Sequence, residues 1–193
     1  SFAVEALKAE KVELILFNED GTEEKYPLVK GENSQWQGFF PGIKPGQHYQ
    51  YCIDGARKID PYGRSHTTRG NENEDLSSVE DIPHSIVCKD KDYSWDDATW
   101  MQKRKDKDDI AKEKMSIYEV HPSSFKKHKD GTLLTYRELA VELVNRFDEY
   151  SFSHVELMGI LDHPSRRSLG YQITGFFALM ELCFVGFHQR IDE

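Results

Sequence analysis

Residues 12–28 read VELILFNEDGTEEKYPL and contain the pattern that decides the fold of the first half of the chain. Residues 12–17 are apolar and β-branched, which is typical of a strand inside a core. The next five residues contain an Asp-Gly pair, and glycine tolerates the positive φ that a hairpin turn requires. Residues 26–28 lie on the return. The stretch therefore predicts an antiparallel β-hairpin.

Three further strands are indicated around this hairpin, at residues 2–4 (FAV), 34–40 (SQWQGFF) and 48–53 (HYQYCI). Pro-Gly and Asp-Gly pairs stand between them, as is usual for turns. Short strands at this spacing predict an immunoglobulin-like β-sandwich over residues 2 to about 90.

The periodicity changes in the second half. Residues 115–120 (MSIYEV) and 154–158 (HVELM) are strand candidates, and Thr135 with Glu138 forms a capping-box signature between them. The apolar residues of the intervening helix recur at helical spacing, at Leu139, Leu143, Phe147 and Tyr150. Strand, helix and strand in this order predict a βαβ unit with parallel strands, so the chain is a multi-domain β plus α/β protein.

Two polar stretches interrupt these patterns. Residues 71–81 contain five acids and no base, which is typical of a solvated loop. Residues 102–114 carry six bases and four acids, a balance that fits an exposed linker better than a nucleic-acid patch. We therefore divide the chain into a sandwich at 1–94, a charged linker at 95–114 and an α/β segment at 115–193.

The charge balance excludes several classes of partner. The chain has 25 Lys and Arg and 34 Asp and Glu. The resulting net charge of −9 disfavours binding to nucleic acid and to anionic membranes. No stretch approaches the roughly 18 apolar residues of a membrane span, and the N-terminus does not resemble a signal peptide. Cys52, Cys88 and Cys183 are odd in number and far apart, which predicts reduced thiols in a cytoplasmic protein.

The second half contains four characteristic sequence blocks. In chain order they are SIYEVH at 116–121, LTYRELA at 134–140, SHVELM followed by DHP within 153–164, and GYQITGFFA at 170–178. Together they resemble the first strands of the catalytic barrel of glycogen branching enzymes, which belong to the α-amylase family. The resemblance implies that residues 115–193 form an incomplete (β/α) barrel segment, the first two βα units of a (β/α)₈ barrel.

The first half is similar to the family-48 carbohydrate-binding module that precedes such barrels. The matching landmarks include PGIKPGQ at 41–47, IDG at 53–55 and DPY at 60–62. The module is about as similar to that of debranching enzymes, and the barrel blocks favour branching. Ala56 and Arg57 stand where modules that bind glycogen tightly have a tryptophan.

The resemblance implies an activity for the complete enzyme, which cleaves an α-1,4 bond through a covalent glucosyl-enzyme intermediate and transfers the chain to a 6-hydroxyl. A barrel takes about 200–250 residues, far more than the stretch after Lys114 supplies. The family's nucleophile Asp, acid/base Glu and transition-state Asp lie on later strands. We therefore expect no catalytic residue here, no cofactor, and at most weak binding of α-glucan.

Four residues are candidates for substrate binding. The family resemblance implies that Tyr171 stacks beneath the sugar at the cleavage point, since an aromatic face suits the apolar C–H face of glucose. Gln172 and His163 are weaker candidates from the same region. Trp36 is the fourth, although a tryptophan in an alternating strand is more often part of the core.

Local residues offer two other chemistries, and we favour neither. A retaining reaction at a sugar needs two carboxylates about 5–5.5 Å apart, and Glu119, Glu156 and Asp162 are the candidates. In the family such residues hold the barrel together. His121, His154 and His163 match no short metal-ligand motif, so we expect no metal site.

A non-catalytic interaction or structural protein is one alternative function, and a debranching-type relative is another. A truncated parallel sheet leaves an unpaired edge, which favours self-association or a partner chain. Residues 179–187 (LMELCFVGF) are apolar with one charge and are the candidate contact surface.

Overall fold

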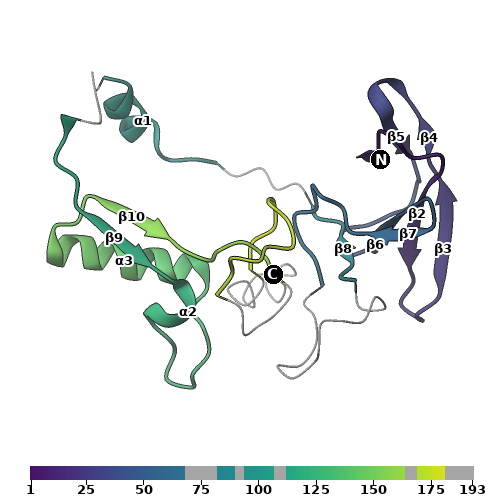
Figure 1. Ribbon diagram of the computed structural model, residues 1–193. Coiled ribbons are helices and arrows are strands. Elements are labelled where there is room, and N and C mark those ends of the chain that lie inside the picture. The colour runs from purple at the N-terminus through teal and green to yellow at the C-terminus, as the bar shows by residue number, and fades with distance from the viewer. Residues whose placement is uncertain (68–81, 90–93, 107–111, 164–168, 181–193) are drawn as a thin grey trace. The chain divides into compact units, whose positions relative to one another are not determined.

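The computed structural model describes residues 1–67, 82–89, 94–106, 112–163 and 169–180. The chain divides into two compact units, which we describe separately. Unit 1 combines Ser1–Cys88 with the residues from Gly159 onward, and unit 2 is Lys89–Met158. Figure 1 shows their elements.

Unit 1 is built from two antiparallel sheets. In the larger sheet, β2 (Val12–Phe17) lies between β3 (Glu23–Pro27) and β6 (His48–Ile53), and β6 also pairs with two short strands, β7 (Ala56–Lys58) and β8 (Ser85–Ile86). The smaller sheet has the order β1-β5-β4, made of β1 (Phe2–Glu5), β5 (Gln35–Gly38) and β4 (Val29–Lys30), and a 3₁₀ turn (Glu32–Ser34) precedes β5. The predicted strands of the first half are therefore confirmed.

The predicted hairpin joins β2 to β3. Gly21 has a φ of +82°, and its N–H donates to the Asn18 carbonyl at 3.0 Å. The Asn18 N–H in turn donates to the Thr22 carbonyl at 2.8 Å, which closes the turn. A side chain at position 21 would have to adopt the same left-handed backbone, so glycine is the residue that this turn favours.

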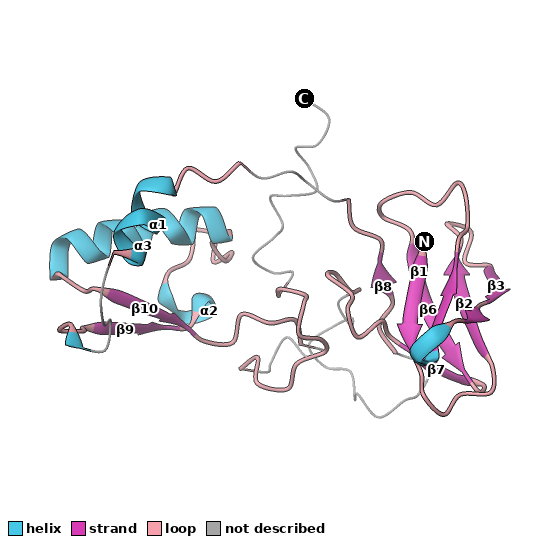
Figure 2. Cartoon of the chain, turned by 90° about the horizontal axis from the view of Figure 1, so that it is seen from above, coloured by secondary structure: helices cyan, strands magenta, loops and turns pink. Residues whose placement is uncertain are grey.

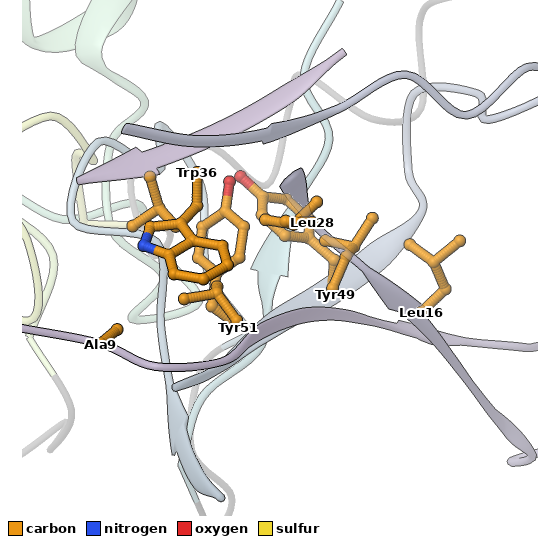
Figure 3. Close-up of a cluster of buried hydrophobic side chains, with 9 residues drawn as sticks. Ala9, Leu16, Leu28, Trp36, Tyr49 and Tyr51 are labelled. Atoms are coloured by element: carbon orange, nitrogen blue, oxygen red, sulfur yellow. The ribbon is translucent and has the colours of Figure 1, made fainter. Parts of the chain in front are cut away.

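The core of unit 1 lies between the two sheets. Val12 and Leu14 are fully buried there, together with Trp36, Tyr49 and Tyr51. Figure 3 shows these three aromatic side chains between strand ribbons. The Tyr51 hydroxyl donates to the Ala3 carbonyl at 3.1 Å, so the hydroxyl of this large buried ring has a partner.

Unit 2 contains the predicted βαβ arrangement. Strands β9 (Ile117–Val120) and β10 (His154–Leu157) pair in parallel, and α3 (Tyr136–Tyr150) lies between them in sequence and runs alongside them in Figure 2. A short helix, α2 (Pro122–Phe125), follows β9. Val120, Leu134, Leu139 and Leu143 form the small core between helix and strands.

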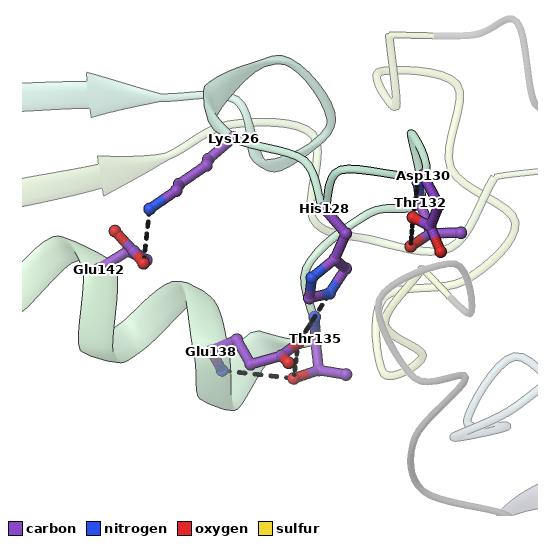
Figure 4. Close-up of polar contacts among 7 residues, drawn as sticks. All are labelled: Lys126, His128, Asp130, Thr132, Thr135, Glu138 and Glu142. Atoms are coloured by element: carbon purple, nitrogen blue, oxygen red, sulfur yellow. Dashed lines mark hydrogen bonds and ion pairs between the residues drawn. The ribbon is translucent and has the colours of Figure 1, made fainter.

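The capping box of α3 is present as predicted (Figure 4). The Thr135 N–H donates to the Glu138 carboxylate at 2.8 Å, and the Glu138 N–H donates to the Thr135 hydroxyl oxygen at 3.3 Å. The Thr135 hydroxyl also donates to the Glu138 carboxylate, at 2.8 Å, and the two donors of Thr135 hold the pKa of Glu138 below its usual value. His128 lies 3.4 Å from the same carboxylate, and Lys126 forms an ion pair with Glu142 at 2.7 Å.

The structure differs from the sequence expectations in two places. A helix, α1 (Ala98–Lys105), forms inside the predicted linker, although none of its residues is buried. The expected barrel segment over 115–193 is not confirmed, because its first strand-helix-strand unit forms in unit 2 whereas the residues from Gly159 group with unit 1. The predicted loop at 71–81 and all but two residues of the apolar stretch at 179–187 lie outside the described residues.

Within the described part of the chain, no helix has the length and apolar character needed to cross a bilayer.

Candidate functional site

A buried contact fixes the segment that begins at Gly159 to the sandwich. The His66 ring nitrogen Nδ1 lies 3.1 Å from the Asp162 carboxylate oxygen Oδ2, and both side chains are buried. Because a carboxylate accepts, Nδ1 carries the proton of this hydrogen bond. A Cβ at Gly175 would lie 3.2 Å from the His66 ring, so the close approach of the segment to this ring favours glycine. We call this contact the His66–Asp162 clip.

Backbone hydrogen bonds extend from the clip into residues 169–180, which we call the Tyr171 loop. The Thr174 N–H donates to the Asp162 carbonyl at 2.7 Å, and the Asp162 N–H donates to the Ala178 carbonyl at 3.0 Å. The Met180 N–H also donates to the Ile160 carbonyl at 2.9 Å. The loop therefore has a defined backbone although it contains no helix or extended strand.

The loop presents Tyr171 to solvent. Its side chain is 68% exposed, and Gln172 beside it is also exposed. Gly170, which precedes them, has a φ of +81°, and a Cβ there would come within 2.6 Å of the Gly159 carbonyl oxygen. This position therefore requires glycine, and the backbone conformation of Gly170 sets the position of the Tyr171 side chain that follows it.

The other two candidates are buried. His163 directs Nδ1 at the Leu161 carbonyl, 3.0 Å away, so its ring is held by the backbone two residues earlier. Trp36 is 7% exposed and its indole N–H donates to the Ala6 carbonyl at 3.2 Å. Trp36 belongs to the core cluster, and Lys30 Nζ lies over its ring at 5.4 Å from the centroid, so we do not retain Trp36 as a stacking surface.

The alternative chemistries receive little support from the geometry. Glu119 and Glu156 are register partners on β9 and β10, and both are exposed. Asp162, the third carboxylate, is engaged by the clip. Among the residues that the structure describes, no three His, Cys, Asp or Glu side chains are grouped to hold a metal ion.

The structure adds Tyr62 and Phe177 to the exposed aromatic residues of unit 1. Their ring centroids lie 5.2 Å apart, so a side chain from the sandwich contacts one from the Tyr171 loop. Both belong to sequence blocks that marked the family resemblance, DPY and GFF. Membership in those blocks was the sequence signal that could have identified the two residues as candidates. Nothing in the sequence showed that their rings would be in contact.

Comparisons with known proteins identify relatives of both halves. Residues 1–63 match the family model "Carbohydrate-binding module 48 (Isoamylase N-terminal domain)". The 1,4-alpha-glucan branching enzyme GlgB of Bacillus cereus (strain B4264) is 39% identical over 167 residues, which are 84% of this chain and 24% of that protein. The corresponding enzyme of Bacillus anthracis (strain CDC 684 / NRRL 3495) is 38% identical over the same length. The chain thus spans about a quarter of the length of these curated relatives.

A solved structure supports the fold. The crystal structure of a putative alpha amylase from Salmonella typhimurium matches 94% of this chain and 26% of its own chain, with a TM-score of 0.61 and 21% sequence identity. At this identity the match shows a shared fold. Residues 1–63 are therefore similar to carbohydrate-binding module 48, and 167 residues of the chain are similar to the N-terminal part of 1,4-alpha-glucan branching enzymes.

Proposed function

We propose that this chain is the N-terminal portion of a 1,4-α-glucan branching enzyme and that it binds α-glucan through Tyr171. The observation that carries the proposal is the exposed ring of Tyr171, fixed by Gly170 and by the His66–Asp162 clip. The kinship with branching enzymes and the carbohydrate-binding module at 1–63 support glucan as the ligand.

The chemistry of such binding follows from the two exposed side chains. The face of the Tyr171 ring packs against the C–H face of a glucosyl ring, which removes apolar surface from water. The Gln172 amide offers two N–H donors and an oxygen acceptor to the sugar hydroxyls. His163 is buried and hydrogen-bonded to the Leu161 carbonyl, so we assign it no direct contact with the sugar.

The proposal assigns no catalysis to the 193 residues themselves. In the complete enzyme, a barrel that begins near residue 115 would cleave an α-1,4 bond and transfer the chain to a 6-hydroxyl. Such a reaction needs a nucleophile and an acid/base about 5–5.5 Å apart at a sugar. The engagement of Asp162 by the clip supports the proposal that this carboxylate has no catalytic role.

Native affinity electrophoresis tests the proposal. Glycogen cast into the gel should retard the wild-type chain, and free maltooligosaccharides should reverse the retardation. Tyr171→Ala should reduce it, because the stacking surface is lost. Trp100→Ala, which removes an exposed ring from α1 in unit 2, should leave it unchanged. Equal mobility of the wild-type chain with and without glycogen would refute the proposal.

A second candidate function is self-association through unit 2. Its two-stranded sheet exposes Ile117, the register partner of His154, and Val155, the register partner of Tyr118. An exposed apolar strand edge favours pairing with another strand. Light scattering should then give a mass that rises with concentration, and a constant monomer mass would exclude this candidate.

A further inference from the structure

Unit 1 contains a hollow of about 540 Å³ beside the end of β5. Its lining includes Phe39, Phe40, Tyr49, Asp60, Tyr62 and Arg64. We call it the Phe39 hollow. Its volume lies within the range of about 300–1,000 Å³ that is usual for small-molecule sites. Among the described residues, none that lines it belongs to the Tyr171 loop.

The hollow has exposed aromatic residues and buried aromatic residues in its wall. Phe39 and Tyr62 are 76% and 62% exposed, so most of each ring is open to solvent. Tyr49 is buried, and its ring meets that of Phe2 edge-on with centroids 5.0 Å apart. Two open rings on a packed aromatic base can accommodate the apolar face of a flat ligand.

Asp60 fixes one side of this hollow. Its carboxylate accepts a hydrogen bond from the Tyr49 hydroxyl at 2.7 Å and from the Tyr62 N–H at 2.8 Å. Its own N–H donates to the Ser85 hydroxyl oxygen at 2.9 Å. The backbone that carries Tyr62 is therefore held in place before any ligand arrives, which lowers the entropy lost on binding.

The charges of the lining restrict the ligand. Asp60 disfavours an anion, as does the net charge of −9, and the Arg64 guanidinium disfavours a cation. A neutral ligand with many hydroxyls is compatible with both groups, because carboxylate oxygens accept and guanidinium N–H groups donate hydrogen bonds. A sugar ring has those hydroxyls and an apolar C–H face.

We propose that the Phe39 hollow binds a glucosyl unit of a neutral glucan, as a second site besides Tyr171. The α-linkage of that glucan rests on the proposed function above. Phe39 packs on the sugar face, while Arg64 and the remaining acceptor capacity of Asp60 bind its hydroxyls. None of the described residues from Gly159 onward lines the hollow, and the segment reaches it only through the contact of Phe177 with the Tyr62 ring.

An NMR titration of the ¹⁵N-labelled chain with maltotriose tests this site separately from Tyr171. The amide signals of Phe39, Tyr62 and Arg64 should shift along one saturation curve. Phe39→Ala should raise the dissociation constant obtained from that curve about tenfold or more, as truncation of a central aromatic contact does. Phe39→Trp should preserve it, because a larger ring retains the stacking surface.

Phe176→Ala is the matched control, since Phe176 is 74% exposed in the same unit but does not line the hollow. The control should leave the hollow curve unchanged. If the signals at Tyr171 shift and those of the hollow do not, the second site is refuted and the proposed function stands. If neither set shifts, both proposals are refuted.

Discussion

Replacing Asp162 by alanine tests how the Tyr171 loop is held. The clip joins residues 96 positions apart, and the His66 side chain is completely buried. The other ring nitrogen of His66, Nε2, has no hydrogen-bond partner in the described structure. Asp162→Ala would therefore leave both ring nitrogens buried and unpaired. A buried polar group that loses its partner costs about 1–3 kcal/mol.

This cost should appear as local opening of the Tyr171 loop rather than as complete unfolding. The Thr174 and Met180 amides are hydrogen-bonded to Asp162 and Ile160, so hydrogen exchange at these two amides reports the opening. We expect exchange about 5- to 150-fold faster in Asp162→Ala, the factor that corresponds to 1–3 kcal/mol. The amides of β2 and β6 should exchange as in the wild type.

Asp162→Asn is the matched control, because the amide oxygen can still accept from Nδ1–H while the charge is removed. We expect its exchange rates to lie closer to the wild type than to Asp162→Ala. Unchanged exchange at Thr174 and Met180 in the alanine variant would refute the clip as the contact that holds the loop.

Three further changes have defined outcomes. Thr135→Ala removes one half of the α3 capping box and should destabilise unit 2 by about 1 kcal/mol in urea unfolding, whereas an unchanged midpoint would show that the cap contributes nothing. Gly170→Ala places a Cβ 2.6 Å from the Gly159 carbonyl at a φ of +81°, so glycogen retardation should fall while the far-ultraviolet circular dichroism is retained, and undiminished retardation would contradict the role of this glycine. Burial and a hydrogen bond to Asp60 raise the pKa of Tyr49 above its usual 10.0, so the folded state binds this proton more tightly than the unfolded state. Stability should then be complete below pH 10 and fall as the pH rises above it, and a flat stability profile between pH 9 and 11 would oppose this assignment.

The elements with local signals were predictable from the sequence. The β2–β3 hairpin follows from an apolar run and an Asp-Gly turn, and the start of α3 follows from Thr135 and Glu138. These features depend on residues a few positions apart, so the local sequence pattern is sufficient to predict them. The parallel pairing of β9 with β10 follows from the helix between them.

Features that depend on distant residues were not predictable. Helix α1 buries none of its residues and carries its three charged residues in its last turn, so no hydrophobic periodicity marked it. The clip pairs His66 with Asp162, and no sequence motif around either residue predicts contact with the other. The Phe39 hollow gathers side chains from β6 and from turns on both sides of it, which only the folded chain brings together.

The binding roles assigned to the candidate residues stay predictions. Tyr171 and Gln172 are exposed, as a binding role requires, and this role stays a proposal. The alternation around Trp36 fitted a core position as well as a platform, and burial of the indole places it in the core. An alternating pattern indicates that one face of a strand is buried but does not identify which face binds a ligand.

Isothermal titration of the 193-residue chain with maltoheptaose, compared with cellohexaose, tests the central claim most directly. Both ligands are neutral glucose oligomers of similar size, and they differ in linkage. We expect saturable heat with the α-linked oligomer and a much weaker response to the β-linked one. No saturable heat with maltoheptaose, or equal binding of the two, would contradict an α-glucan-binding role.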